Sequence, residues 1–141
     1  MSRFPDLCDA VVDASAIVDF LLQPARDAPL SRLLSQRDID LHVPMLCELE
    51  VVAGVRRALL RGRLPGIESA RSIVQDLVDL PLELYPHQPI LSRTLDLYEN
   101  FTTYDAAYVG LAEALGIPLL TSDARLATAT RTHTDVEVLT A

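Results

Sequence analysis

Two aspartates in this 141-residue sequence follow short apolar runs of the kind that form buried strands. Asp13 stands directly after Ala10–Val12, and Asp123 comes shortly after Pro118–Thr121, a run that is too short for a helix. Because the carboxyl ends of parallel strands meet at one edge of a sheet, where ligands bind, we expect these two carboxylates to lie close together. The sequence therefore predicts an acidic cluster at that edge.

A third carboxylate, Asp105, falls at the start of a predicted helix. Thr102 or Thr103 is the expected N-cap, because a hydroxyl oxygen can accept an unpaired amide hydrogen at that position. Asp105 then lies in the first turn, where the helix dipole favours a negative charge. Gly116 is the expected left-handed C-cap. The apolar stripe of this helix comprises Ala106, Val109, Ala112 or Ala114, and Leu115.

The fourth acidic candidate lies on the longest predicted helix, residues 45–62. Glu48 and Glu50 point about 200° apart on a helix, so only one of them can face the cluster. Glu50 lies on the side of Leu46 and Ala53, which is expected to be buried, and a buried carboxylate has to be paired or bind metal. Glu50 is therefore the predicted ligand, and Glu48 is expected to be solvated. The predicted apolar stripe consists of Leu46, Leu49, Val52 or Ala53, Val55 or Arg56, and Leu59 or Leu60.

The chemistry of these four acids follows from their mutual repulsion. Carboxylates that crowd together resist ionisation unless a cation is present. Hard divalent ions that prefer oxygen ligands, Mg²⁺ or Mn²⁺, satisfy such a cluster. Any one pair of acids also fits two unrelated surface residues, but the repeated order of strand, acid, small residues and helix favours a metal site.

Strands and helices alternate along the chain, which predicts a three-layer α/β/α sandwich around a mainly parallel sheet. The predicted strands cover residues 9–13, 41–43, 82–84, 118–121 and 136–139. The predicted helices cover residues 15–22, 30–36, 45–62, 67–80 (or from Pro65), 88–100, 103–115 and 124–130. With no linker, repeat or phosphate-cradling glycine loop, we expect one domain over residues 1–141 that binds no nucleotide cofactor.

The composition limits the classes of protein that fit. No apolar run is long enough to span a bilayer, and Asp6 and Asp9 interrupt the N-terminal segment, which predicts a cytoplasmic protein with no membrane partner. In a reducing compartment Cys8 and Cys47 are expected to be buried thiols rather than a disulfide.

The basic residues are distributed unevenly, although the net charge is −8 and argues against a broadly basic surface. All twelve are arginine, and four of them lie within eight residues. We call these four the arginine strip: Arg56, Arg57, Arg61 and Arg63. Guanidinium groups bind phosphate in a bidentate fork and also pair with carboxylates of a protein partner. The strip therefore fits a phosphate substrate, a protein partner or a solvated helix face.

Other residues that often carry chemistry receive plainer interpretations. His42, His87 and His133 each stand without an acidic partner at motif spacing, so no catalytic role is predicted for them. Tyr104 and Tyr108 flank Asp105 at helical spacing, and we interpret them as core or rim packing rather than as platforms for stacking bases.

Nearly the whole chain resembles the PIN-domain ribonucleases, and most closely the VapC toxins of toxin–antitoxin pairs. The matching segments are VVDASAIVDFLL, VPMLCELEVVAGVRRALLRGRL and LYENFTTYDAAYVGLAEALGIPLLTSDARLA. A D-x-S start matches Asp13 and Ser15, and a P-x-L-x-x-x-E pattern followed by an arginine pair selects Glu50 over Glu48. Any one of these pieces is weak alone, whereas the four acids at these spacings are specific.

The remaining motifs of the resemblance are the YDAAY helix start, which matches Asp105, and the T-x-D strand exit, which matches Thr121 and Asp123. The resemblance implies an endoribonuclease that depends on Mg²⁺, or on Mn²⁺ as a substitute, with a central five-stranded parallel sheet. It implies that Ser15 and Thr121 orient the carboxylates. The implied catalytic and metal-binding residues are Asp13, Glu50, Asp105 and Asp123.

The resemblance also implies partners. These are an RNA substrate (structured RNA such as tRNA or rRNA), a cognate antitoxin protein and a second copy of the chain in a homodimer. Two other functions stay open: a metal-dependent DNA nuclease of the same fold, and a PIN-like binding protein without catalysis. The small size argues against the first, since flap nucleases need added arch elements, and the four intact acids argue against the second.

Overall fold

The computed structural model describes residues 9–22 and 40–140. The strands are β1 (Asp9–Val12), β2 (Asp40–Pro44), β3 (Leu82–Tyr85), β4 (Leu119–Thr121) and β5 (Val138–Thr140). The helices are α1 (Ala14–Leu22), α3 (Leu46–Leu60), α4 (Ile67–Asp79), the 3₁₀ turn η1 (Gln88–Ile90), α5 (Leu91–Asp96), α6 (Thr103–Leu115) and α7 (Ala124–His133). The helix predicted at residues 30–36 and the thiol of Cys8 lie outside the described residues.

The five strands form one parallel sheet in the order β3-β2-β1-β4-β5. The predicted five-stranded parallel sheet is therefore confirmed. The chain winds outward from β1 to β3, crosses back to β4, and continues to β5, so the winding direction reverses between β1 and β4. In doubly wound sheets the ligand-binding crevice lies at the carboxyl edge of such a switch point. Asp13 and Asp123 follow β1 and β4, the two strands that border it.

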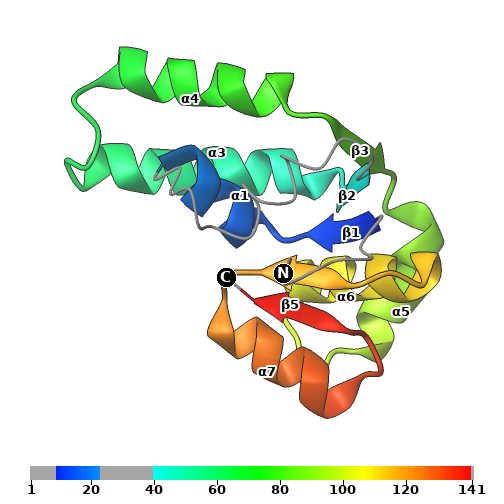
Figure 1. Ribbon diagram of the computed structural model, residues 1–141. Helices are drawn as coiled ribbons and strands as arrows, with labels where there is room; N and C mark the ends of the chain where they lie inside the picture. The colour runs from blue at the N-terminus through cyan, green and yellow to red at the C-terminus, as the bar shows by residue number, and fades with distance from the viewer. Residues whose placement is uncertain (1–8, 23–39, 141) are drawn as a thin grey trace, which may run out of the picture.

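Helices cover the sheet in two groups (Figure 1). Helices α1, α3 and α4 pack against one another, and α5 packs against α6, which contacts β1, β2 and β4. Right-handed crossovers place the helices after β1 and β2 on one face and those after β3 and β4 on the other. This gives the predicted three layers. No helix in residues 9–22 or 40–140 is long and apolar enough to cross a membrane.

Helix α6 is the central helix of the core. Residues Ala106 to Ala112 are all buried, because small and β-branched residues let the sheet approach this helix closely. The side chain of Thr102 accepts a hydrogen bond from the Asp105 amide, and Gly116 ends the helix with φ of 67°. Both predicted caps are confirmed. The predicted stripe was too narrow, since every side of this stretch is buried and only the first turn, with Thr103 and Tyr104, and the last turn, from Glu113, reach solvent.

The predicted stripe on α3 was only partly right: Val55 is buried and Leu46 and Leu59 are partly buried, but the other predicted positions are exposed. The buried residues of α3 are Cys47, Val51, Gly54, Val55 and Ala58, whereas Leu49 is 76% exposed and Leu60 67% exposed. Apolar side chains surround most of this helix, so periodicity alone does not distinguish the face that meets the core from the face that meets solvent. The exposed apolar face of α3 instead lines a surface groove described below.

Other element boundaries differ modestly from the predictions. The helix predicted at residues 88–100 is a 3₁₀ turn followed by the short helix α5, which ends at Asp96. Helix α7 continues three residues beyond the predicted end at Thr130, and β5 starts two residues later than predicted. Cys47 is a buried free thiol, as predicted.

Helices α1 and α3 approach each other very closely at one glycine. A Cβ atom added to Gly54 would lie 2.8 Å from a methyl carbon of Val18, so only glycine allows this spacing. Gly54 is one turn after Glu50 on α3, and Val18 is on the helix that begins just after Asp13. The close packing therefore fixes the distance between the α3 carboxylate and the β1 carboxylate.

Candidate active site

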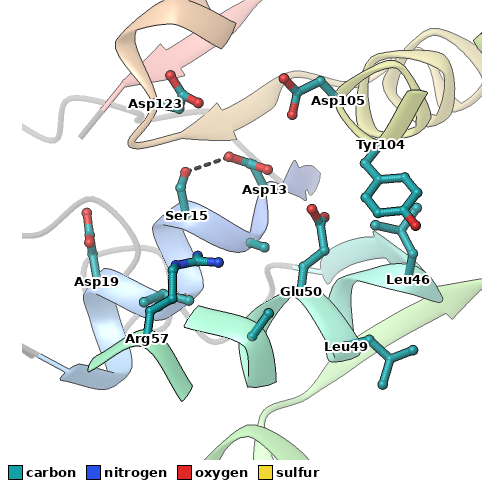
Figure 2. A pocket seen from close by; sticks show the side chains of 13 residues that line it. Asp13, Ser15, Asp19, Leu46, Leu49, Glu50, Arg57, Tyr104, Asp105 and Asp123 are labelled. Carbon is teal, nitrogen blue, oxygen red and sulfur yellow. Dashed lines mark hydrogen bonds between the residues drawn. The ribbon is translucent and has the colours of Figure 1, made fainter. Parts of the chain in front are cut away.

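The four predicted acids line one open cleft of about 670 Å³ at the carboxyl edge of the sheet. Figure 2 shows Asp13, Asp105 and Asp123 on one side of this cleft and Glu50 reaching toward them from α3. The sequence prediction thus placed all four in the same region, although they come from four separate elements. We call this region the carboxylate cleft.

Asp13 is the most deeply placed of the four, and two hydroxyls fix it. Ser15 Oγ donates to Asp13 Oδ2 at 2.5 Å, and Thr121 Oγ1 donates to the same oxygen at 2.9 Å. The Asp13 amide donates to the Leu120 carbonyl of β4 at 2.9 Å, which ties the two strand ends together. Ser15 and Thr121 were expected to orient carboxylates, and the structure places both hydroxyls on Asp13.

The same hydroxyls also fix the loop after β4. Ser15 Oγ accepts from the Ser122 amide at 3.1 Å, and Thr121 Oγ1 accepts from the Asp123 amide at 3.0 Å. Asp123 is the N-cap of α7, with Oδ1 accepting from the amides of Arg125 and Leu126. Capping by Oδ1 holds the Asp123 side chain in one orientation at the cleft.

Glu50 is held by a residue whose role the sequence did not indicate. The buried hydroxyl of Tyr108 donates to Glu50 Oε1 at 2.7 Å. These residues are 58 positions apart, and no local spacing predicts their contact. Glu48 is exposed and lines a different groove, as expected for the solvated member of the pair.

Among the described residues, the carboxyl groups of the cleft lack enough positive charge nearby to balance their burial and their mutual repulsion. Burial raises the pKa of Asp13, partly offset by its hydroxyl donors, and the charge of Asp123 raises it further. Burial also raises the pKa of Glu50, against the Tyr108 hydrogen bond, and Asp13 and Asp105 add to the rise. For Asp105, burial and then the charge of Asp13 raise the pKa. Three carboxyl groups in one cleft therefore resist ionisation.

One guanidinium of the arginine strip lines the cleft. Figure 2 shows Arg57 extending from α3 toward the side where Asp13 and Ser15 lie. The charge of Arg57 lowers the pKa of Glu50 but ranks after burial and the neighbouring carboxylates. Within residues 9–22 and 40–140, no ion pair joins Arg57 to a carboxylate. The other three arginines of the strip are exposed and do not line the cleft.

A divalent cation fits the chemistry of the cleft. The donors that face it are carboxylate and hydroxyl oxygens, which Mg²⁺ and Mn²⁺ prefer. In the part of the chain that the structure describes, no three carboxylate, imidazole or thiol groups are close enough to enclose an ion directly. Mg²⁺ usually keeps several waters and binds one or two carboxylates directly, so a spaced set of acids suits a hydrated ion.

None of the three histidines lines the cleft, and His42 has acidic partners that no motif spacing indicated. His42 Nε2 lies 2.7 Å from Asp9 Oδ1, and Nδ1 lies 2.6 Å from the Tyr85 hydroxyl and 3.4 Å from Glu83 Oε2. Strand register brings these residues together, since His42 pairs with Glu83 across β2 and β3. We call Asp9, His42, Glu83 and Tyr85 the histidine cluster.

Comparison with known proteins places these features in context. A sequence model described as the PIN domain matches residues 10–131. Ribonuclease VapC1 of Mycobacterium tuberculosis is 42% identical over 122 residues, which cover 86% of this chain and 90% of that protein.

Two solved structures resemble the fold. The toxin–antitoxin complex from Klebsiella pneumoniae matches with a TM-score of 0.61 and 15% identity, covering 92% of this chain and 95% of that one. VapC20 of M. tuberculosis, described as a sarcin-ricin loop cleaving toxin, matches with a TM-score of 0.64 and 13% identity, covering 85% and 94%.

Proposed function

The chain belongs to the PIN-domain family, and from that premise we propose that it is an endoribonuclease toxin of the VapC class whose carboxylate cleft binds Mg²⁺. The observation that carries the metal proposal is the gathering of four carboxylates around one cleft, three of them with raised pKa values. Such a cleft is unfavourable when it is empty of cations. The proposed catalytic and metal-binding residues are Asp13, Glu50, Asp105 and Asp123.

A bound divalent ion would activate water as a nucleophile near neutral pH and stabilise the charge that develops on the phosphate. The residues of this chain hold the carboxylates in the orientations that such an ion needs. Ser15 and Thr121 hold the carboxylate of Asp13 in one orientation at the end of β1. Capping of α7 fixes Asp123, and the first turn of α6 positions Asp105. Asp13, Asp105 and Asp123 thus stand at the ends of secondary-structure elements, and Glu50 reaches them from within α3.

Arg57 is the proposed contact for a phosphate of the RNA backbone. It is the one member of the arginine strip that lines the cleft, and its guanidinium can bind a phosphate oxygen pair in a bidentate fork. At a net charge of −8 the protein does not attract RNA at long range, so a few short contacts have to supply the affinity. Structured RNA such as tRNA or rRNA remains the proposed substrate class.

An antitoxin is the proposed protein partner, and the surface offers a groove for one of its segments. This apolar groove of about 790 Å³ lies between α3, α4, η1–α5 and α6. Leu46, Leu49 and Tyr104 line both the groove and the carboxylate cleft. A peptide with an apolar face in the groove would therefore reach the acids, where an arginine side chain could satisfy them and exclude the metal.

A homodimer is the proposed oligomeric state. Exposed apolar side chains, among them Leu60, Leu95 and Tyr98, lie outside the groove and the cleft. Isolated exposed apolar residues are normal, so the number of subunits has to be measured by light scattering on the purified protein at micromolar concentration. A monomer under those conditions would remove this part of the proposal.

The test of the ribonuclease assignment compares RNA and DNA substrates with the protein in Mg²⁺ and in EDTA. We expect cleavage of RNA only, in Mg²⁺ only, by the wild type and by Glu48→Gln, and no cleavage by Glu50→Gln. Cleavage of DNA would favour the nuclease alternative, and binding of RNA without cleavage would favour a binding protein. Equal activity of the two glutamine variants would exclude Glu50 as a ligand.

A further inference from the structure

Tyr108 is completely buried, yet its hydroxyl donates to Glu50, one of the side chains that line the carboxylate cleft. Its ring belongs to the hydrophobic core, and a phenylalanine would fill that space equally well. A buried hydroxyl has to find a partner, because leaving it unpaired costs free energy. Here the partner is Glu50, at 2.7 Å, so α6 and α3 meet through a polar contact beside the proposed metal site.

The hydrogen bond from Tyr108 matters because Glu50 has the longest side chain of the four acids and the most torsions to fix. Asp13 is bound by two hydroxyls and Asp123 caps a helix, whereas Glu50 has three side-chain torsions and is half-exposed. A ligand that has to be ordered when the ion arrives binds it less tightly than one already in place. The hydrogen bond that Tyr108 donates to Oε1 orders the Glu50 side chain before a metal ion binds.

We propose that Tyr108 is a positioning residue, which fixes the carboxylate of Glu50 so that it can bind the metal ion of the carboxylate cleft. This inference rests on the proposed function, since it takes Glu50 to be a metal ligand. It adds to the four acids a fifth residue that does not touch the ion and acts only through Glu50.

Removing the hydroxyl alone tests the proposal. We expect Tyr108→Phe in the full-length protein to weaken Mn²⁺ binding, measured by isothermal titration calorimetry, by about 10- to 100-fold, the range for residues that support a metal ligand. Cleavage by this variant should recover when the Mn²⁺ concentration is raised. A merely structural role would lower stability without shifting the metal concentration that activity requires.

Tyr85→Phe is the matched control. It also removes a tyrosine hydroxyl that bonds a partly buried side chain, in this case His42 at 2.6 Å, but it lies in the histidine cluster and not at the cleft. We expect it to lose stability and to keep the Mn²⁺ affinity of the wild type. Loss of Mn²⁺ affinity in Tyr85→Phe equal to that in Tyr108→Phe would overturn the proposal.

A double-mutant cycle separates this inference from the proposed function. If Tyr108 acts through Glu50, adding Tyr108→Phe to Glu50→Gln should change the Mn²⁺ affinity little further. Equal affinities of the wild type and Glu50→Gln would refute the proposed function. A clear loss in Glu50→Gln with wild-type affinity in Tyr108→Phe, or additive losses in the double variant, would overturn only the role of Tyr108.

A measurement on the unmutated protein covers the case in which Tyr108→Phe does not fold. In protein labelled with ¹³C at the tyrosine ζ carbons, binding of Mg²⁺ draws charge from the Glu50 carboxylate and changes the hydrogen bond from Tyr108. We expect the Tyr108 resonance to move with Mg²⁺ and the Tyr85 resonance to stay. A Tyr108 resonance that does not move while Mg²⁺ binds would overturn the proposal.

Discussion

The carboxylate cleft and the histidine cluster both gather acids on the same sheet, but the acids have different hydrogen-bond partners. In the histidine cluster the imidazole of His42 bridges Asp9 and Tyr85 and lies 3.4 Å from Glu83, so the protein supplies the partner from its own strands. In the carboxylate cleft the acids meet hydroxyl donors and one another. The first arrangement is complete as it stands, and we propose that the second takes up a cation from outside.

The pKa shifts express this difference. At the cleft, burial raises the pKa values of Asp13, Glu50 and Asp105, and neighbouring carboxylates raise each of them further. A protein selected only for stability would not keep three such groups in one cleft, because each one costs free energy when ionised. Strained electrostatics of this kind concentrate at functional sites. The comparison therefore points to the carboxylate cleft as the functional site, because its acids lack a partner of opposite charge among the residues that the structure describes.

The largest expected effect separates the two regions by activity. Asp13→Asn keeps the shape of the side chain and removes its charge, so we expect RNA cleavage to fall by more than about 100-fold, above the range for residues that only support a ligand. The same change in the histidine cluster, Asp9→Asn, should leave cleavage within about twofold of the wild type. Rates on one RNA substrate under saturating Mg²⁺ give the comparison, and similar losses in both variants would contradict it.

A smaller effect is expected from the arginine strip. Arg57→Ala should raise the KM for RNA by about 10- to 100-fold, since a charged hydrogen bond to phosphate contributes on the order of 1.5–3 kcal/mol. Arg61→Ala, about one turn further along the chain at the C-cap of α3 and outside the cleft, should change it little. Few phosphate contacts also imply a shallow dependence of RNA affinity on salt. A steep slope in a filter-binding assay with Asp13→Asn protein would reveal a broad basic surface.

Stability should change in opposite directions in the two regions. In metal-free protein at pH 7, Asp13→Asn removes a buried charge and should raise the melting temperature by roughly 4 °C, the shift that about 1 kcal/mol produces in a domain of this size. Asp9→Asn weakens a charge-assisted bond to His42 and should lower it. Calorimetry on both variants in EDTA measures the signs, and a shared sign would remove the distinction drawn between the regions.

The pH dependence gives the smallest effect. Native pKa values raised above the ordinary carboxyl range, about 4, mean that the folded protein binds more protons than the unfolded chain just above that range. Stability therefore falls as pH rises through this window and is regained on acidification. We expect the drop in unfolding free energy between about pH 4 and pH 7, measured with urea in EDTA, to be smaller in Asp13→Asn than in the wild type. An equal drop would mean that folding does not raise the pKa of Asp13.

The sequence predicted what depends on local signals. Strand ends located Asp13 and Asp123, capping rules located the start of α6, and the side of α3 that carries Leu46 and Ala53 selected Glu50 over Glu48. That side was expected to be buried, but Ala53 is exposed and the side lines the open cleft. Each of these rests on spacing within one element or on the shared edge of parallel strands.

What the sequence did not predict depends on packing between distant elements. The bond from Tyr108 to Glu50 and the bond from His42 to Asp9 join residues that only strand register and helix docking bring together. The buried face of α3 was missed because its apolar residues surround the helix. For the same reason nothing local distinguished Arg57, which lines the cleft, from Arg56, which does not.

The most direct test of the central claim is the effect of a divalent ion on stability. Adding Mn²⁺ to metal-free protein at pH 7 should raise the melting temperature of the wild type, because an ion that binds only the native state stabilises it. The rise should persist in Asp9→Asn and be lost in Asp13→Asn. No rise in the wild type, or an equal rise in Asp13→Asn, would show that the carboxylate cleft is not a metal site.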